Sequence, residues 1–326
     1  MKHVPSSAPV SPIERYYSAV ASLAEGFAHV DDCDLEAPFA TAFMASAPFP
    51  PPRETIDDLP TKESMVEGLL THFKAPIPDV IVPISQVDPS KKPKTIRAAM
   101  ATPYAKYWAE AIVNEWFSIV GNNTWVLVDQ KPWMKIIPCK WILDIKIDEE
   151  NVPYRFKARL VAGGHRQMEG IDYNETYAHV SKLATIRTLL AVAASRGWEV
   201  HQLDITTAFL HGEIDAEVYM RQPPGFVDGV HKVCKLEKSL YGLKQAPRLW
   251  YQTLARILGD LGFKPVSADN SFWVKDDASC TVYLTTIVDD MLITSASKEL
   301  TLQIVHAILA ELPGNHLGIA KNLNGM

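Results

Sequence analysis

The stretch VYLTTIVDDMLITSA, residues 282–296, decides the fold. It has two apolar, β-branched runs on either side of an Asp-Asp pair, and apolar runs separated by turn-forming residues predict a β-hairpin. Asp289 and Asp290 then sit at the hairpin turn. A tight turn there points their carboxylates at the end of a neighbouring strand.

A second strand is predicted in EVHQLDI, residues 199–205. Successive side chains of a strand point to opposite faces, so Gln202 and Asp204 share one face. Leu203 and Ile205 share the other face. An acidic side chain therefore projects from the polar face of an otherwise apolar strand.

Carboxylates that converge from different strands suit a particular chemistry. Two-metal phosphoryl or nucleotidyl transfer uses such a pair to hold two cations, and Mg²⁺ prefers hard oxygen ligands. Taken alone, these residues leave a second interpretation open. An Asp-Asp pair is a good turn former, and a single Asp can serve only to solvate the end of a strand.

The remaining pattern mixes helices with antiparallel strands. Helices are predicted from Thr102-Pro103 to Gly121, where Thr is the N-cap and Pro the first helical residue, and over residues 182–196 and 246–261. PCKWILDIKID (138–148) and YRFKARLVA (154–162) predict another hairpin. Strands and helices that are segregated in this way favour the α+β class.

The N-terminal part has a different composition. Residues 1–94 contain 14 of the 23 prolines, and such density opposes regular packing. We therefore expect residues 1–95 to be a Pro-rich, linker-like segment, largely extended or disordered, with a short helix near Pro12–Gly26. Residues 96–326 form the expected folded part.

The acidity of the chain is concentrated at this end. The formal net charge is −6. Residues 1–94 hold 8 Lys/Arg and 13 Asp/Glu, a balance of −5, whereas residues 131–250 hold 17 and 14, a balance of +3. Nucleic-acid binders neutralise phosphates with Lys and Arg, so the middle of the chain permits nucleic-acid binding without requiring it.

Cysteine usage and hydropathy bear on the compartment. The 4 cysteines are far apart and form no CxxC pair, which argues against a zinc knuckle or a disulfide framework and favours a reducing compartment. No apolar run is long enough for a membrane span. We expect an intracellular, cytoplasmic protein with no membrane partner, and nuclear access stays open.

Three long blocks carry a family resemblance: QLDITTAFLHGEIDAEVYMRQPPGF (202–226), VCKLEKSLYGLKQAPRLWY (233–251) and YLTTIVDDML (283–292). In order and spacing they resemble the reverse transcriptase of copia-type LTR retrotransposon Pol polyproteins, and the similarity extends over about residues 102–295. The resemblance implies a right-hand polymerase core of fingers and palm, with an antiparallel palm sheet. It also implies RNA-directed DNA polymerase activity, in virus-like particles if the element is active.

By this resemblance, Asp204 and Asp289 are the metal-bridging carboxylates, and Asp290 is the third acidic residue of the catalytic site. The implied cofactors are two Mg²⁺ or Mn²⁺ ions. The implied partners are an RNA or DNA template with its primer and deoxynucleoside triphosphates, while protein partners stay unassigned.

The resemblance also assigns nucleotide-binding residues. Lys157 and Arg159 would reach the triphosphate from the fingers, although such a pattern by itself is usually an ordinary solvated strand face. Phe209 would be a steric gate beneath the sugar, or else a core aromatic residue. The block SLYGLKQAP would contribute to the nucleotide and template-primer pocket, or would be only a loop before a helix. Its candidate residues are Tyr241, Gly242, Lys244 and Gln245.

Several departures from the family pattern favour an alternative function. Ile287 replaces a tyrosine that packs near the primer terminus, and His179 replaces a proline. The chain ends at Met326, so we expect most of the thumb and all of the RNase H region to be absent. The alternative is a decayed, non-catalytic retroelement fragment that at most binds nucleic acid weakly.

Overall fold

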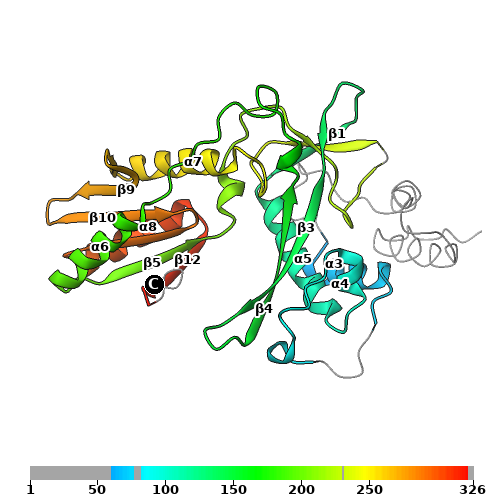
Figure 1. Ribbon diagram of the computed structural model, residues 1–326, viewed down its shortest axis with the longest axis horizontal. Helices are drawn as coiled ribbons and strands as arrows, with labels where there is room; N and C mark the ends of the chain where they lie inside the picture. The colour runs from blue at the N-terminus through cyan, green and yellow to red at the C-terminus, as the bar shows by residue number, and fades with distance from the viewer. Residues whose placement is uncertain (1–59, 77–81, 230, 322–326) are drawn as a thin grey trace, which may run out of the picture. The chain divides into compact units, whose positions relative to one another are not determined.

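The computed structural model describes residues 60–76, 82–229 and 231–321 (Figure 1). The chain divides into two compact units. The first unit contains the described residues up to Gly163 together with the segment Val218–Leu236, and the second contains Gly164–Glu217 and the described residues from Glu237 onward. Helices and antiparallel sheets occur in both, so the predicted α+β class is confirmed. In the described ranges, no helix is long and apolar enough to cross a membrane.

The expected linker contains a helix. Residues 1–59, including the helix expected near Pro12–Gly26, lie outside the described residues, but α3 (Lys62–His72) is helical and packs on α5 (Ala105–Gly121). The Thr61 hydroxyl caps α3 by accepting a hydrogen bond from the Ser64 amide. Leu69 is among its buried residues. The linker prediction is therefore wrong for α3, because no proline interrupts residues 61–75 and an apolar face is available there.

The next helices also begin differently from the prediction. Thr102 is not the N-cap of α5 (Ala105–Gly121), because the helix begins later and Tyr104 is its N-cap. The Thr102 hydroxyl donates a 2.7 Å hydrogen bond to the Ala99 carbonyl at the end of α4 (Ile96–Met100) and accepts one from the Tyr104 amide. The short helix η2 (Ile84–Gln86) precedes α4. Helix α5 then buries a wide apolar face, which includes Trp108, Ile112, Trp116 and Ile119.

The predicted hairpin of the first unit is formed by β3 (Cys139–Ile147) and β4 (Pro153–Ala162), which pair antiparallel. One face packs on α5, where the Phe156 ring meets Trp108 edge-on at 4.5 Å. A second sheet has the order β1-β7-β6-β2. Its strands are β1 (Trp125–Asp129), β2 (Ile136–Ile137), β6 (Tyr219–Met220) and β7 (Lys232–Leu236).

The second unit is built on a six-stranded antiparallel sheet of order β12-β5-β11-β10-β9-β8 (Figure 1). The predicted strand is β5 (Val200–Ile205), and the predicted hairpin is β10 with β11. In the hairpin, β10 spans Thr281–Ile287 and β11 spans Asp290–Ser295. The remaining strands are β8 (Lys264–Val266), β9 (Asp269–Asp276) and β12 (Gly314–Ile319). The alternation predicted for β5 is confirmed, because Leu203 and Ile205 are buried in the core.

Helices cover both faces of this sheet. The larger core contains Leu203 and Ile205 of β5 with α7 (Ala246–Asp260) and α8 (Lys298–Glu311). On the opposite face, α6 (Leu183–Arg196) packs on Val200 and Leu292. Short 3-10 turns, η3 (Gly164–Arg166) and η4 (Ala208–His211), complete the unit.

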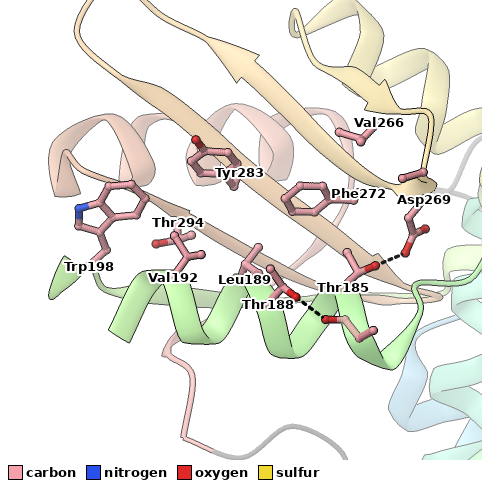
Figure 2. A pocket seen from close by; sticks show the side chains of 12 residues that line it. Thr185, Thr188, Leu189, Val192, Trp198, Val266, Asp269, Phe272, Tyr283 and Thr294 are labelled. Carbon is pink, nitrogen blue, oxygen red and sulfur yellow. Dashed lines mark hydrogen bonds between the residues drawn. The ribbon is translucent and has the colours of Figure 1, made fainter. Parts of the chain in front are cut away.

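A groove of about 430 Å³ runs between α6 and the sheet (Figure 2). Its floor carries a row of stacked rings. The ring centroids of Phe272 and Tyr283 are 6.2 Å apart, and those of Tyr283 and Trp198 are 6.1 Å apart. Leu189 and Val192 of α6 form part of the opposite wall. The groove thus lies on the side of the sheet that α6 covers, and most of its lining side chains are apolar.

Candidate active site

Strand pairing brings the three predicted catalytic acids together. Asp204 is the next-to-last residue of β5 and Asp290 the first of β11, and the two are direct partners in the antiparallel register. Asp289 lies in the turn that joins β10 to β11. The carboxylate cluster, defined as Asp204, Asp289 and Asp290, therefore comes from two adjacent strands and one turn.

The turn that carries Asp289 has an unusual backbone. Ile287 pairs with Asp290, so Val288 and Asp289 form a two-residue loop. Val288 has a φ of 57°, in the left-handed region that β-branched residues rarely adopt. Two hydrogen bonds hold the loop: the Trp250 indole Nε1 donates to the Val288 carbonyl at 2.7 Å, and the Ile205 amide donates to the Asp289 carbonyl at 2.9 Å.

The negative charges of Asp289 and Asp204 disfavour a further negative charge on Asp290. Burial raises the pKa of Asp290, and the carboxylates of Asp289 and Asp204 raise it further. A 3.2 Å hydrogen bond from the Gln202 side-chain amide opposes this rise. Mutual repulsion between carboxylates is the condition that a bound cation relieves.

The donor set suits a hard divalent cation, because all three groups are carboxylates. Within the described ranges, however, no group of three or more His, Cys, Asp or Glu side chains is already gathered closely enough to hold a metal ion. The cluster thus provides the charge and the donor type for Mg²⁺ or Mn²⁺, and its side chains would have to close around the ion.

Two of the predicted nucleotide-binding residues meet beside the end of β5. Phe209 lies in η4, and its ring meets the ring of Tyr241 edge-on at a centroid distance of 5.0 Å. The Ser239 hydroxyl donates to the Phe209 carbonyl and ties the two segments together. Both rings are half-buried. Phe209 packs against the larger core and also keeps an exposed part, so both predicted roles stay open.

The loop before α7 presents part of the predicted pocket. Gly242 is exposed at a φ of 89°, a conformation that glycine adopts without strain. Lys244 is exposed as well, and its ammonium donates a 3.0 Å hydrogen bond to the Tyr173 hydroxyl. The close approach of Gly164 to the Gly242 carbonyl leaves no room for a Cβ atom at position 164.

Gln245 belongs to the same loop but is buried. Its side chain has 0% exposure, and both ends of its amide are used within the protein. The nitrogen donates to the Asp172 carbonyl at 2.8 Å, and the oxygen accepts from Gln167 at 2.9 Å. Because this buried amide is hydrogen-bonded at its nitrogen and at its oxygen, the conformation favours a structural role in the loop over the predicted contact with a nucleotide, which stays a prediction.

The two predicted fingers residues belong to the first unit. In the register of the β3–β4 hairpin, Lys157 lies opposite Asp144 and Arg159 lies opposite Ile142. Asp144 also forms a 2.6 Å ion pair with Lys92. Lys157 and Arg159 are half-buried on the same face of β4, as the alternation predicted.

Several residues that shape the site were not recognised from the sequence. In the sequence, Trp250 lies on the apolar stripe of residues 246–261, Gln202 is notable only for its strand face, and nothing distinguishes Gln167. A tryptophan on an apolar helical stripe predicts burial, but nothing in the stripe shows where the indole N–H points. Such side-chain hydrogen bonds depend on contacts that are distant in the sequence.

This geometry describes an α+β protein with a carboxylate cluster at a strained hairpin turn. The chain belongs to the reverse transcriptase (RNA-dependent DNA polymerase) family, whose model matches residues 122–326. Retrovirus-related Pol polyproteins of copia-like transposons are among its similar proteins, which confirms the resemblance seen in the sequence.

Two relatives show the extent of the match. The Pol polyprotein from transposon RE1 of Arabidopsis thaliana is 43% identical over 201 residues, which cover 61% of this chain and 14% of the relative. The Pol polyprotein from transposon TNT 1-94 of Nicotiana tabacum is 37% identical over 243 residues, or 74% of this chain and 18% of the relative. The chain therefore spans less than a fifth of the length of these two relatives.

Among solved structures, the chain is similar to that of a foamy viral protease-reverse transcriptase in complex with double-stranded DNA. The two share 12% sequence identity over 80% of this chain and 40% of that one, with a TM-score of 0.34.

Proposed function

We propose that this chain is an RNA-directed DNA polymerase that adds deoxynucleotides to the 3′-end of a primer. The observation that carries the proposal is the register that pairs Asp204 with Asp290 beside the turn of Asp289. Membership in the reverse transcriptase family supports it. In this reading the second unit corresponds to the palm, and the β3–β4 hairpin of the first unit belongs to the fingers.

Asp204 and Asp289 would hold two Mg²⁺ or Mn²⁺ ions, with Asp290 as the third acidic group. Such cations activate the primer 3′-hydroxyl and offset the charge on the leaving pyrophosphate. The protein's own contribution is to fix the carboxylates. The paired strands set the spacing of Asp204 and Asp290, and the two hydrogen bonds to the turn orient Asp289.

The remaining residues would bind substrate. Lys157 and Arg159 supply cations for the triphosphate, and the exposed Lys244 with Gly242 offers a cation beside an accessible backbone. The edge-to-face pair of Phe209 and Tyr241 would pack beneath the sugar and base. The partners are a primed RNA or DNA template and deoxynucleoside triphosphates.

Primer extension on an oligo-primed RNA template tests the proposal. The native chain is compared with Asp289→Asn in Mg²⁺ and in Mn²⁺. Asp277→Asn is the matched control, because Asp277 lies in the β9–β10 turn at the other end of β10. We expect extension by the native chain and by Asp277→Asn, and loss of extension in Asp289→Asn.

The opposite result would favour the second candidate, a non-catalytic retroelement fragment. Ile287, which stands where the family resemblance implies a tyrosine near the primer terminus, favours that candidate. A folded native chain that extends no primer with either metal would overturn polymerase activity. Fluorescence anisotropy with labelled primed template would then show whether weak nucleic-acid binding persists.

A further inference from the structure

The turn that positions Asp289 is held in a conformation that its own sequence disfavours. Val288 has a φ of 57° although its branched Cβ crowds the backbone in that region. Its side chain is 39% exposed, so little packing compensates for the strain. A conformation of this kind persists only when surrounding contacts impose it.

One such contact, made to Val288 itself, comes from α7. The Trp250 side chain is 2% exposed, and its Nε1 donates a 2.7 Å hydrogen bond to the Val288 carbonyl. The rest of the indole packs in the core shared by α7, α8 and the sheet, which fixes its direction. Because a buried ring has little freedom to move, its N–H can hold the carbonyl of a strained residue in place.

We infer that Trp250 is a positioning residue, which locks Val288 in the left-handed conformation and thereby fixes Asp289 beside Asp204. An effect of this hydrogen bond on catalysis rests on the proposed function, whereas its effect on the conformation of the turn does not. Trp250 would act through the turn, without touching substrate.

The chain supplies its own control. Trp273, on β9, belongs to the same core and is also 2% exposed. Its Nε1 is buried, and within the described residues it has no hydrogen-bond partner. Trp250→Phe and Trp273→Phe therefore remove similar ring volume from one core, but only the first removes a hydrogen bond to the turn.

Hydrogen exchange gives the first readout, because it depends on neither metal nor activity. Exchange is followed by mass spectrometry in peptides that span residues 284–294, with thermal unfolding as the check on folding. We expect exchange at the turn to become about three- to tenfold faster in Trp250→Phe, as loss of one hydrogen bond implies. Equal exchange in Trp250→Phe and Trp273→Phe would overturn the inference.

Manganese binding gives the second readout, measured from the paramagnetic resonance signal of free Mn²⁺, with Asp289→Asn to identify the site. We expect Trp250→Phe to weaken binding about three- to tenfold and Trp273→Phe to leave it near the native value. Adding Val288→Gly to Trp250→Phe should recover part of the affinity, because glycine adopts positive φ without a Cβ penalty. No recovery would contradict the role assigned to strain.

Primer extension separates this inference from the proposed function. Suppose that the native chain binds Mn²⁺ but extends no primer, and that the turn exchanges faster in Trp250→Phe than in Trp273→Phe. The polymerase proposal then fails, and the positioning role of Trp250 stands. If the native chain extends primers and Trp250→Phe behaves like Trp273→Phe in exchange and Mn²⁺ binding, the positioning role of Trp250 is overturned and the polymerase proposal stands.

Discussion

The side-chain amide of Gln167 donates a 2.9 Å hydrogen bond to the side-chain oxygen of Gln245, and both side chains are buried. The oxygen of Gln167 in turn accepts a 2.8 Å hydrogen bond from the Lys244 backbone amide. The pair therefore ties η3 to the start of α7 and sets the path of the loop that presents Gly242 and Lys244. Buried polar groups are costly when unpaired, so this link is a sensitive point of the second unit.

Gln245→Ala leaves the Gln167 amide and the Asp172 carbonyl without this partner. We expect the free energy of unfolding to fall by about 1–3 kcal/mol. Gln252→Ala, at an exposed position of the same helix, should change it by less than about 0.5 kcal/mol. Urea unfolding measures both. Equal stability of the two variants would contradict the structural role and return Gln245 to the list of candidate ligand contacts.

Gly164→Ala tests the close approach beneath the same loop. An added methyl group would collide with the Gly242 carbonyl oxygen, which belongs to the backbone and cannot rotate away. We expect destabilisation by about 1–3 kcal/mol. Gly121→Ala on α5 is the control, since nothing lies within 4 Å of its added methyl group. A Gly164→Ala protein as stable as Gly121→Ala would show that the loop moves aside without cost.

Patterns with a short period could be predicted from the sequence. The alternation in 199–205 and the apolar stripe of 246–261 gave β5 and α7 because strand and helix periods are local properties. Asp289 lies in the predicted turn, whereas Asp290 is already the first residue of β11, because the turn begins one residue earlier, at Val288. The family resemblance added which acids belong together.

Relationships between distant segments could not be predicted in this way. The register that pairs Asp204 with Asp290 joins residues 86 positions apart, and the Trp250–Val288 hydrogen bond joins residues 38 positions apart. Neither leaves a periodic signal. Helix α3 was missed for another reason, because the proline content of the surrounding segment hid a short capped helix whose burial depends on α5.

That helix can be tested by a core substitution. Leu69 is 5% exposed, so Leu69→Ala should lower the free energy of unfolding of the first unit by about 2–4 kcal/mol. Leu70→Ala, at a half-buried position of the same helix, should cost clearly less. Denaturant unfolding is followed by hydrogen exchange in peptides of α5, where Trp108 and Trp116 lie in the core of the first unit. Tryptophan fluorescence would also respond to Trp250 and Trp273 of the second unit. No effect of Leu69→Ala would mean that α3 does not contribute to the folded core and that the linker interpretation holds there.

A buried acid under the β3–β4 hairpin gives the unit a pH dependence. Burial raises the pKa of Glu115 from 4.5 to about 7, although its hydrogen bond from the Leu160 amide and the cations of Arg159 and Lys157 oppose the rise. The folded protein therefore keeps a proton that the unfolded chain releases near pH 4.5. Between about pH 4.5 and 7 the folded state binds more protons, so through this group stability falls as the pH rises across that window.

Glu115→Gln should remove this part of the pH dependence. The amide oxygen can still accept the hydrogen bond from Leu160, and the side chain stays neutral at every pH. We expect the variant to match the native chain near pH 4.5 and to exceed its stability by about 1–3 kcal/mol at pH 8. Glu110→Gln on the same helix controls for the loss of one negative charge. Unfolding free energies measured at half-unit steps from pH 4.5 to 8 decide the matter, and parallel curves for the native chain and Glu115→Gln would rule out a buried proton on Glu115.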